Sequence, residues 1–390
     1  MNNYNLLFNI AILFGFFSCS KPLPPTSNVN SDIVNVEHTV ELPDLKDSKE
    51  IYYSELFSKV RYIELDSHPS QAIIGSIAGT EITNDGDIVI LDQRNCKIIR
   101  YDSCGHFLNL IGDRGHGPNE FIQPKSICYD KYDNQILVLD SWSGKVLFYS
   151  LDGKMAKSIS VAYPDGIRVV DSKHRLLFYN YFPECLDHNF LICTNDGEEC
   201  CRFDPVPDSF KSKQHPATNF VFSNTEDDAL LCRAGYSSII YKVKGSKVSA
   251  FIELTSKEKK WSFGRSEELM TAYENRNKTS IGQFHFVNDK FCIQGFNIED
   301  GFLFEYWSDF KGMTRGGRKM VNDIDGLIAK VGGNVACHGK EIYKGYTSID
   351  IEEIIESWKG NNNVSQKERD FVTKMANNIN LFFQVCTVKD

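Results

Sequence analysis

The stretches GDIVILDQRNCKIIRYDSCGHF (86–107) and NQILVLDSWSGKVLFYSLDGKM (134–155) follow one pattern at a constant offset, so that Ile88 aligns with Ile136 and Gly105 with Gly153. Each copy contains an apolar run, a polar turn that opens on Asp, a second apolar run and a turn with Gly. The pattern predicts two antiparallel strands with their connections. The offset gives a period of about 48 residues, which is typical of β-propeller blades and not of helical repeats.

Weaker copies of the pattern follow along the chain. They are LLFYN with NFLICTNDG (176–180 and 189–197), ALLCR with SIIYKVKG (229–233 and 238–245), KFCIQGF with GFLFEYW (290–296 and 301–307), and NVACHGKEIYKGY (334–346). The length of the chain favours six blades over seven. KVRYIELD (59–66) and LFFQVCTV (381–388) are predicted to share one blade, because a ring that closes leaves no exposed sheet edge.

Three segments read as helices. The first is 267–275, and the second follows Asp350 as its N-cap, with apolar residues spaced as on one helix face. A capping box from Ser365 to Glu368 opens the third. We therefore expect an all-β propeller with short helical insertions near its C-terminus.

The N-terminus reads as a targeting segment. An apolar run from Leu6 to Phe17 is too short to span a bilayer and ends just before Cys19. This resembles a bacterial lipoprotein signal, which implies a signal peptide at 1–18 and lipid on Cys19. The alternatives are an ordinary secretory signal or a short anchor helix. Residues 19–50 are rich in polar residues and Pro and are expected to form a flexible tether, with the propeller at 51–390.

The charge of the chain excludes one class of partner. It holds 52 acidic and 43 basic residues and a formal charge of −9, without a long basic stripe. Such a chain is a poor nucleic-acid binder. No C-x-x-C pair, H-x-H or H-E-x-x-H spacing, or Gly-x-Ser-x-Gly motif occurs. We expect a monomer held at the membrane through its lipid anchor alone.

IGDRGHGPNEFIQP (111–124) is the most specific local sequence. Its glycines permit backbone conformations with positive φ, and Phe121 and Pro124 return to the core. With the strand, Asp turn and Gly that follow, it resembles NHL-like six-bladed β-propellers, in particular the propeller lipoproteins of Gram-negative gut bacteria. The close match covers about residues 59–160. The resemblance implies a propeller in the cell envelope, without one shared activity.

Two sets of residues are candidates for a site. Arg114, His116 and Glu120 could bind a ligand at the junction of two blades, or Glu120 could simply accept hydrogen bonds from turn amides. The second set could place oxygen ligands around the channel for Ca²⁺ or another divalent ion, or could form Asx turns. It consists of Asp92, Asp140 and Asn180, which share one position of the repeat. No other cofactor is expected.

Two functions fit these observations. The first is a binding module for a glycan, a peptide or an envelope protein, placed as an outer-membrane lipoprotein on the periplasmic side. That side is favoured because the residues after Cys19 lack the acidic run of surface-exported relatives. The alternative is a metal-dependent lyase or lactonase-type enzyme with its site in the central channel. Fold analogy alone does not decide between them.

Overall fold

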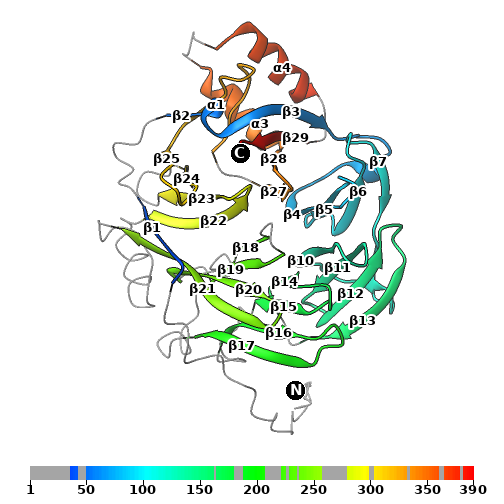
Figure 1. Cartoon of the computed structure of the whole chain (residues 1–390). Coiled ribbons are helices and arrows are strands. Elements are labelled where there is room, and N and C mark those ends of the chain that lie inside the picture. The colour runs from blue at the N-terminus through cyan, green and yellow to red at the C-terminus, as the bar shows by residue number, and fades with distance from the viewer. Residues whose placement is uncertain are drawn as a thin grey trace, which may run out of the picture.

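The structure is a computed structural model. It describes residues 36–42, 50–161, 164–179, 188–206, 221–224, 228–234, 237–256, 279–297, 303–331, 334–359, 364–377 and 381–390. The described strands form six sheets of four or five strands around one axis (Figure 1). The predicted six-bladed β-propeller is confirmed.

Blades 1 to 3 follow one another directly along the chain. Blade 1 contains β4 (Ile77–Ile82), β5 (Ile88–Asp92), β6 (Lys97–Tyr101) and β7 (Phe107–Leu110). Blade 2 contains β10 (Ser126–Asp130), β11 (Gln135–Asp140), β12 (Lys145–Ser150) and β13 (Met155–Ser160). Blade 3 contains β14 (Gly166–Val169), β15 (Leu176–Tyr179), β16 (His188–Cys193) and β17 (Glu199–Pro205). The two best-matched sequence copies are thus the second and third strands of blades 1 and 2.

Blades 4 and 5 follow in the same order. Blade 4 contains β18 (Val221–Asn224), β19 (Leu230–Arg233), β20 (Ile239–Lys244) and β21 (Lys247–Ser256). Blade 5 contains β22 (Thr279–Val287), β23 (Lys290–Asn297), β24 (Leu303–Ser308) and β25 (Thr314–Gly317). The weaker sequence copies predicted these second and third strands correctly.

Blade 6 closes the ring with strands from both ends of the chain. It contains β27 (Val335–His338), β28 (Glu341–Tyr346), β29 (Phe382–Val388) and β3 (Phe57–Glu64). β29 pairs antiparallel with β3, so that Phe383 faces Ile63. The predicted closure by residues 59–66 and 381–388 is confirmed.

The N-terminal part of the propeller begins earlier than the boundary predicted at 51. β1 (His38–Leu42) lies within the segment expected to be a tether and adds a fifth strand to blade 4. It pairs in parallel with β21, with Val40 opposite Leu254, and both side chains are buried. The expectation of a flexible tether is therefore wrong for residues 38–42, because Val40 and Leu42 bury apolar surface between blades 4 and 5.

Short elements fill the remaining connections. β2 (Ile51–Tyr52) pairs in parallel with β26 (Met320–Val321), and β8 (Asp113–Arg114) with β9 (Glu120–Phe121). A helical turn α1 (Tyr53–Leu56) and a 3₁₀ turn (Ser70–Ala72) flank β3.

Two helices, α3 (Ser348–Ser357) and α4 (Gln366–Asn377), interrupt blade 6 between β28 and β29, as predicted. The predicted N-cap of α3 is wrong. Thr347 is the N-cap, and its hydroxyl accepts a hydrogen bond from the amide of Asp350. In return, the carboxylate of Asp350 accepts a hydrogen bond from the amide of Thr347 at 2.8 Å. Asp350 therefore occupies the third helical position of a capping box. The Ser365 cap of α4 is confirmed, and the predicted helix at 267–275 lies outside the described residues.

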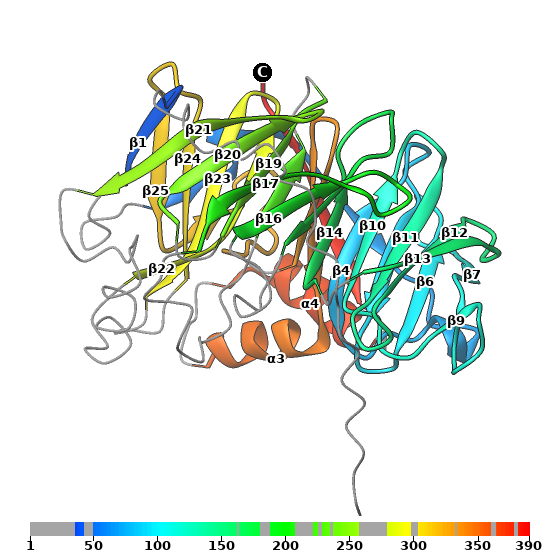
Figure 2. The same cartoon turned by 90° about the horizontal axis from the view of Figure 1, so that it is seen from below.

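The ring has two distinct ends, visible in side view (Figure 2). One end carries α3, α4 and β9, and is called the helix face. The connections between second and third strands and between successive blades lie there. The opposite end holds the C-terminus and the turns between first and second strands, and is called the C-terminal face.

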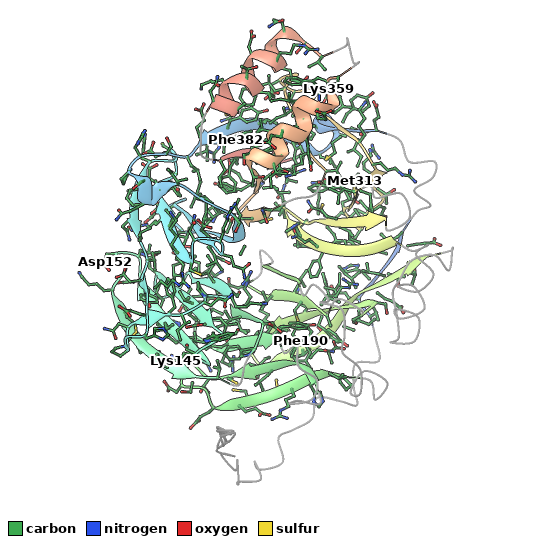
Figure 3. All side chains as sticks on the ribbon, turned by 180° about the vertical axis from the view of Figure 1, so that it is seen from behind. Lys145, Asp152, Phe190, Met313, Lys359 and Phe382 are labelled. Carbon is green, nitrogen blue, oxygen red and sulfur yellow. The ribbon has the colours of Figure 1, made fainter. Side chains whose placement is uncertain are left out.

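The core consists of apolar wedges between neighbouring blades. Between blades 1 and 2, for example, Leu91 and Ile98 pack with Ile136 and Leu147. Phe190 lies in the corresponding wedge between blades 3 and 4 (Figure 3). Full burial of each such side chain contributes about 1.5–3 kcal/mol, so every blade is stabilised by both neighbours. Among the described helices, none has the length and apolar character required to cross a bilayer.

Candidate functional site

A polar cavity of about 370 Å³ lies at the centre of the ring, lined by the innermost strands of blades 1, 2, 3, 5 and 6. The turn residues in its wall belong to the C-terminal face. They are Asn84, Lys131, Asn288 and Gly339. The cavity is therefore formed near that end of the channel. Its volume is at the lower end of the range for small-molecule sites.

Glu81 of β4 and Arg168 of β14 form an ion pair in the cavity wall, with Nη2 and Oε1 3.5 Å apart. The guanidinium is held in place because Nη1 donates to the carbonyls of Ile127 and Ile167, at 3.1 and 2.7 Å. The amide of Tyr129 donates to Glu81 at 3.3 Å. Burial raises the pKa of the Glu81 carboxyl, and Arg168 and the Tyr129 amide oppose this shift.

A second ion pair lies at the mouth of the cavity. The Lys131 ammonium contacts the Asp228 carboxylate, which also accepts a hydrogen bond from the hydroxyl of Tyr132 at 3.0 Å. Lys131 and Asp228 also border a smaller neighbouring cavity of about 30 Å³. Both cationic side chains of the cavity wall, Arg168 and Lys131, thus already face a carboxylate.

Two residues that line the cavity each hold a polar atom that is buried without a hydrogen-bond partner in the described part of the chain. The atoms are Nε2 of His285, in β22, and Oγ1 of Thr80, in β4. His285 is 8% exposed, and its burial lowers the pKa of the imidazole to about 4, so the ring is neutral at pH 7. A buried polar atom without a partner costs free energy, so either side chain would gain a hydrogen bond by turning that atom towards a molecule bound in the cavity.

The structure places the predicted binding residues at the other end of the ring. Arg114, His116 and Glu120 lie in the connection between blades 1 and 2, on the helix face, and none of them lines the described cavities. Oε2 of Glu120 accepts the amide of Gly117 at 2.7 Å. A Cβ on Gly115 would lie 1.9 Å from that oxygen, so this carboxylate fills the loop itself. Arg114 and His116 are exposed.

Asp92 and Asp140 hold the backbone of the blade connections. Asp92 accepts the amides of Gly75 and Ser76, at 2.8 and 3.0 Å. Asp140 makes the equivalent contacts with the amides of Ile122 and Gln123, at 2.7 and 3.2 Å. Each carboxylate therefore links the turn after the second strand to the segment that leads into the innermost strand of the same blade. Their repetition in sequence follows from this structural role. Asn180 and Cys19 lie outside the described residues.

Within the described residues, one group has the composition and spacing of a metal site. It consists of Asp130, Asp133 and His174, at two turns of the C-terminal face, outside the lining of the central cavity. Nδ1 of His174 lies 2.9 Å from Asp130, and Nε2 lies 3.6 Å from Asp133. Gln135 and the amide of Tyr132 donate to Asp130 as well. These hydrogen bonds account for the arrangement without an ion.

The sequence contained no local signal for the cavity. Thr80, Glu81, Arg168 and His285 are single positions on three strands, and none belongs to a motif. Their strands pass alongside the axis, so the positions meet only after the ring has closed. These innermost strands were not predicted from the sequence, so there was no reason to single out their polar positions.

Comparison with known proteins agrees with the geometry. The fold defines a six-bladed β-propeller with a polar cavity on its axis. The chain belongs to the family described as a domain of unknown function, DUF4934, whose model matches residues 33–386. No curated protein matches.

Two solved structures show the same fold. One is from Bacteroides fragilis and is described as an exported protein, with 14% identity and a TM-score of 0.66, covering 91% of this chain and 99% of that one. The other is a DUF4221 family member from Bacteroides vulgatus, with 10% identity and a TM-score of 0.52, covering 86% and 98%.

Proposed function

We propose that this chain is a cell-envelope binding module that takes a small polar ligand into the central cavity. One observation carries the proposal: a polar cavity on the axis of a rigid ring is lined by His285 and Thr80, and each of these residues holds a buried polar atom that lacks a hydrogen-bond partner among the described residues. Concave sites with few, well-placed polar groups are where proteins bind small ligands.

The envelope location rests on the N-terminus and on the fold relative. Cys19 follows an apolar run as in lipoprotein signals, and the similar protein from Bacteroides fragilis is described as exported. We propose a signal peptide at 1–18, a lipid on Cys19, and an outer-membrane lipoprotein on the periplasmic side. Labelling with a fatty-acid probe should mark the protein and not Cys19→Ala, and protease added to intact cells should leave the protein uncut. Equal labelling, or cleavage, would contradict the anchor or the side.

The cavity is tested by blocking it. Thr80→Tyr adds a ring to the cavity wall and should abolish binding in a thermal-shift and calorimetric screen of neutral sugars, uronic acids and dipeptides. The matched control is the double variant Arg114→Ala/His116→Ala, which changes the exposed loop on the helix face. Loss of binding in Thr80→Tyr and retention in the control supports the cavity. The reverse result assigns binding to the loop.

A further inference from the structure

We infer that the ligand of the central cavity is an uncharged, hydroxyl-rich small molecule, a carbohydrate of one or two sugar rings. This inference rests on the proposed function of the cavity. It is drawn from three features of the wall: its paired cationic side chains, the unpartnered atoms of two lining residues, and its mixture of polar and apolar surface.

Each cationic side chain of the wall already faces a carboxylate, one in the wall itself and one just outside it. Arg168 faces Glu81, and Lys131 faces Asp228. An anionic ligand at Arg168 would bring a second negative charge beside Glu81, and a cationic ligand at Glu81 would meet Arg168. Like charges in a site with little water are costly. An uncharged ligand displaces neither partner.

Once turned towards the cavity, the two unpartnered atoms need a ligand group that both donates and accepts hydrogen bonds. A neutral imidazole presents Nε2 either as a donor or as an acceptor, and the Thr80 hydroxyl does both. Sugar hydroxyls match either arrangement, because each one donates one hydrogen bond and accepts two. Their hydrogen bonds also replace those of water without leaving a charge buried.

The rest of the wall suits the C–H surface of a sugar ring. Ile82, Phe286, Val287 and Ala336 line the same cavity as the polar groups. A sugar ring carries hydroxyls around its edge and C–H groups on its faces, so it presents both kinds of surface at short range. The volume of about 370 Å³ limits the ligand to a small one and excludes a folded partner from the channel.

The test is calorimetric titration of the purified protein with defined probes. The neutral probes are glucose, galactose, N-acetylglucosamine, maltose and lactose, and the charged probes are glucuronate and alanyl-alanine. We expect at least one neutral sugar to bind and to raise the melting temperature, with weaker or no binding of the charged probes. Thr80→Val keeps the shape of the side chain and removes its hydroxyl, and should weaken sugar binding about fivefold, the value of one hydrogen bond.

His285→Leu removes the second unpartnered atom and should weaken sugar binding by a similar factor. Leu108→Ala, on the exposed surface of blade 1, is the control and should bind as the unaltered protein does. If only glucuronate or the dipeptide binds, and Thr80→Tyr abolishes this binding, the carbohydrate inference fails while the binding function of the cavity stands. If a sugar binds equally well to Thr80→Tyr, or if no probe binds, both fail.

Discussion

Two ion pairs in this ring differ in how completely the protein surrounds them. Glu305 and Lys344, between blades 5 and 6, are 3.0 Å apart, and both side chains are 0% exposed. Glu81 and Arg168, in the central cavity, are 3.5 Å apart and 17% and 25% exposed. The first pair lies between blade 5 and blade 6, next to the blade that closes the ring, and the second in the wall of a cavity.

The hydrogen bonds around the first pair show what full enclosure requires. Glu305 also accepts from Gln294 at 3.2 Å and from the indole of Trp307 at 3.1 Å, while Lys344 donates to the carbonyl of Lys330 at 3.0 Å. Burial disfavours the ammonium, but the charge and hydrogen bond of Glu305 together with smaller contributions from neighbouring groups outweigh this and raise the pKa of Lys344. Glu305 and Lys344 thus have several internal partners each, whereas two residues of the cavity lining hold atoms that are unpartnered within the described residues. This difference separates a structural polar cluster from a site.

The largest effect should come from removing the strand pairing that closes the ring. Deletion of residues 382–388 removes β29 and leaves β3 without its neighbour in blade 6. We expect an insoluble or protease-sensitive product. Deletion of residues 36–42, which removes the outermost strand β1 of blade 4, is the control and should leave a soluble ring of lower stability. Equal melting temperatures for the first variant and the full chain would contradict the closure.

Removing one partner from each pair should give unequal losses. Lys344→Met leaves Glu305 charged and buried, and should cost about 3–5 kcal/mol in the free energy of unfolding. Arg168→Met, in the partly exposed cavity pair, should cost less, about 1–2 kcal/mol, because water can reach the groups that lose their partner. Chemical denaturation of both variants at pH 7 measures the difference. Equal losses would mean that the two pairs do not differ in the way described.

The pH dependence sharpens the comparison because His285 lies between the two regions. It lines the cavity, and the charges of Glu305 and Lys344 both act on its pKa. Its pKa of about 4 in the folded protein lies below the usual 6.5, so the unfolded chain binds the proton first as the pH falls. The stability contributed by neutral His285 is therefore complete above pH 6.5 and is lost as the pH falls towards 4, by about 3 kcal/mol.

The measurement is the difference in unfolding free energy between the protein and His285→Gln at pH 7.5, 6, 5 and 4. As the pH falls, the unfolding free energy of the unaltered protein should decrease relative to that of the variant, because glutamine does not titrate. Other groups titrate in this range, among them buried Asp204, whose pKa burial raises to about 6. Their contributions cancel in the difference. A difference independent of pH would contradict the neutral, buried state of His285.

The smallest effect concerns Glu81. Because burial raises the pKa of this carboxyl, the folded protein binds its proton more readily than the unfolded chain does. Its protonated form contributes stability at low pH that is lost as the pH rises through the folded pKa. Glu81→Gln resembles the protonated form and should equal or exceed the unaltered protein in the free energy of unfolding at pH 7.5. A loss of about 2 kcal/mol or more would show that the cavity pair is structural after all.

The sequence predicted those parts of the fold that repeat in every blade. Ile88 and Ile136 recur because each second strand is buried on both sides by neighbouring blades. Asp92 and Asp140 recur because each accepts hydrogen bonds from the backbone that leads into the innermost strand of its blade. The terminal strand at 382–388 was predictable because a ring needs closure. β1 was missed because HTVEL is short, lies in a polar stretch, and pairs with a strand that is remote in the sequence.

The candidate site could not be predicted in the same way. The conspicuous motif at 111–124 has a local cause, since its glycines and Glu120 shape one connection between blades. The cavity has a global cause, since Thr80, Arg168 and His285 come from blades 1, 3 and 5. Comparison of the repeats identifies the residues that every blade has in common, whereas the cavity depends on residues that only a few blades have.

The position of β1 has a mechanical consequence. If Cys19 is the membrane anchor, the chain between it and His38 spans at most about 65 Å, and any pull on the protein enters through β1. β1 lies parallel to β21 in a ladder from His38 opposite Ile252 to Leu42 opposite Ser256. A force directed along the strand loads all the hydrogen bonds of this ladder together in shear, so they do not open one by one. The outermost strand of blade 4 then bears the tension on the anchor, so that this tension does not reach the pairing of β29 with β3 that closes the ring.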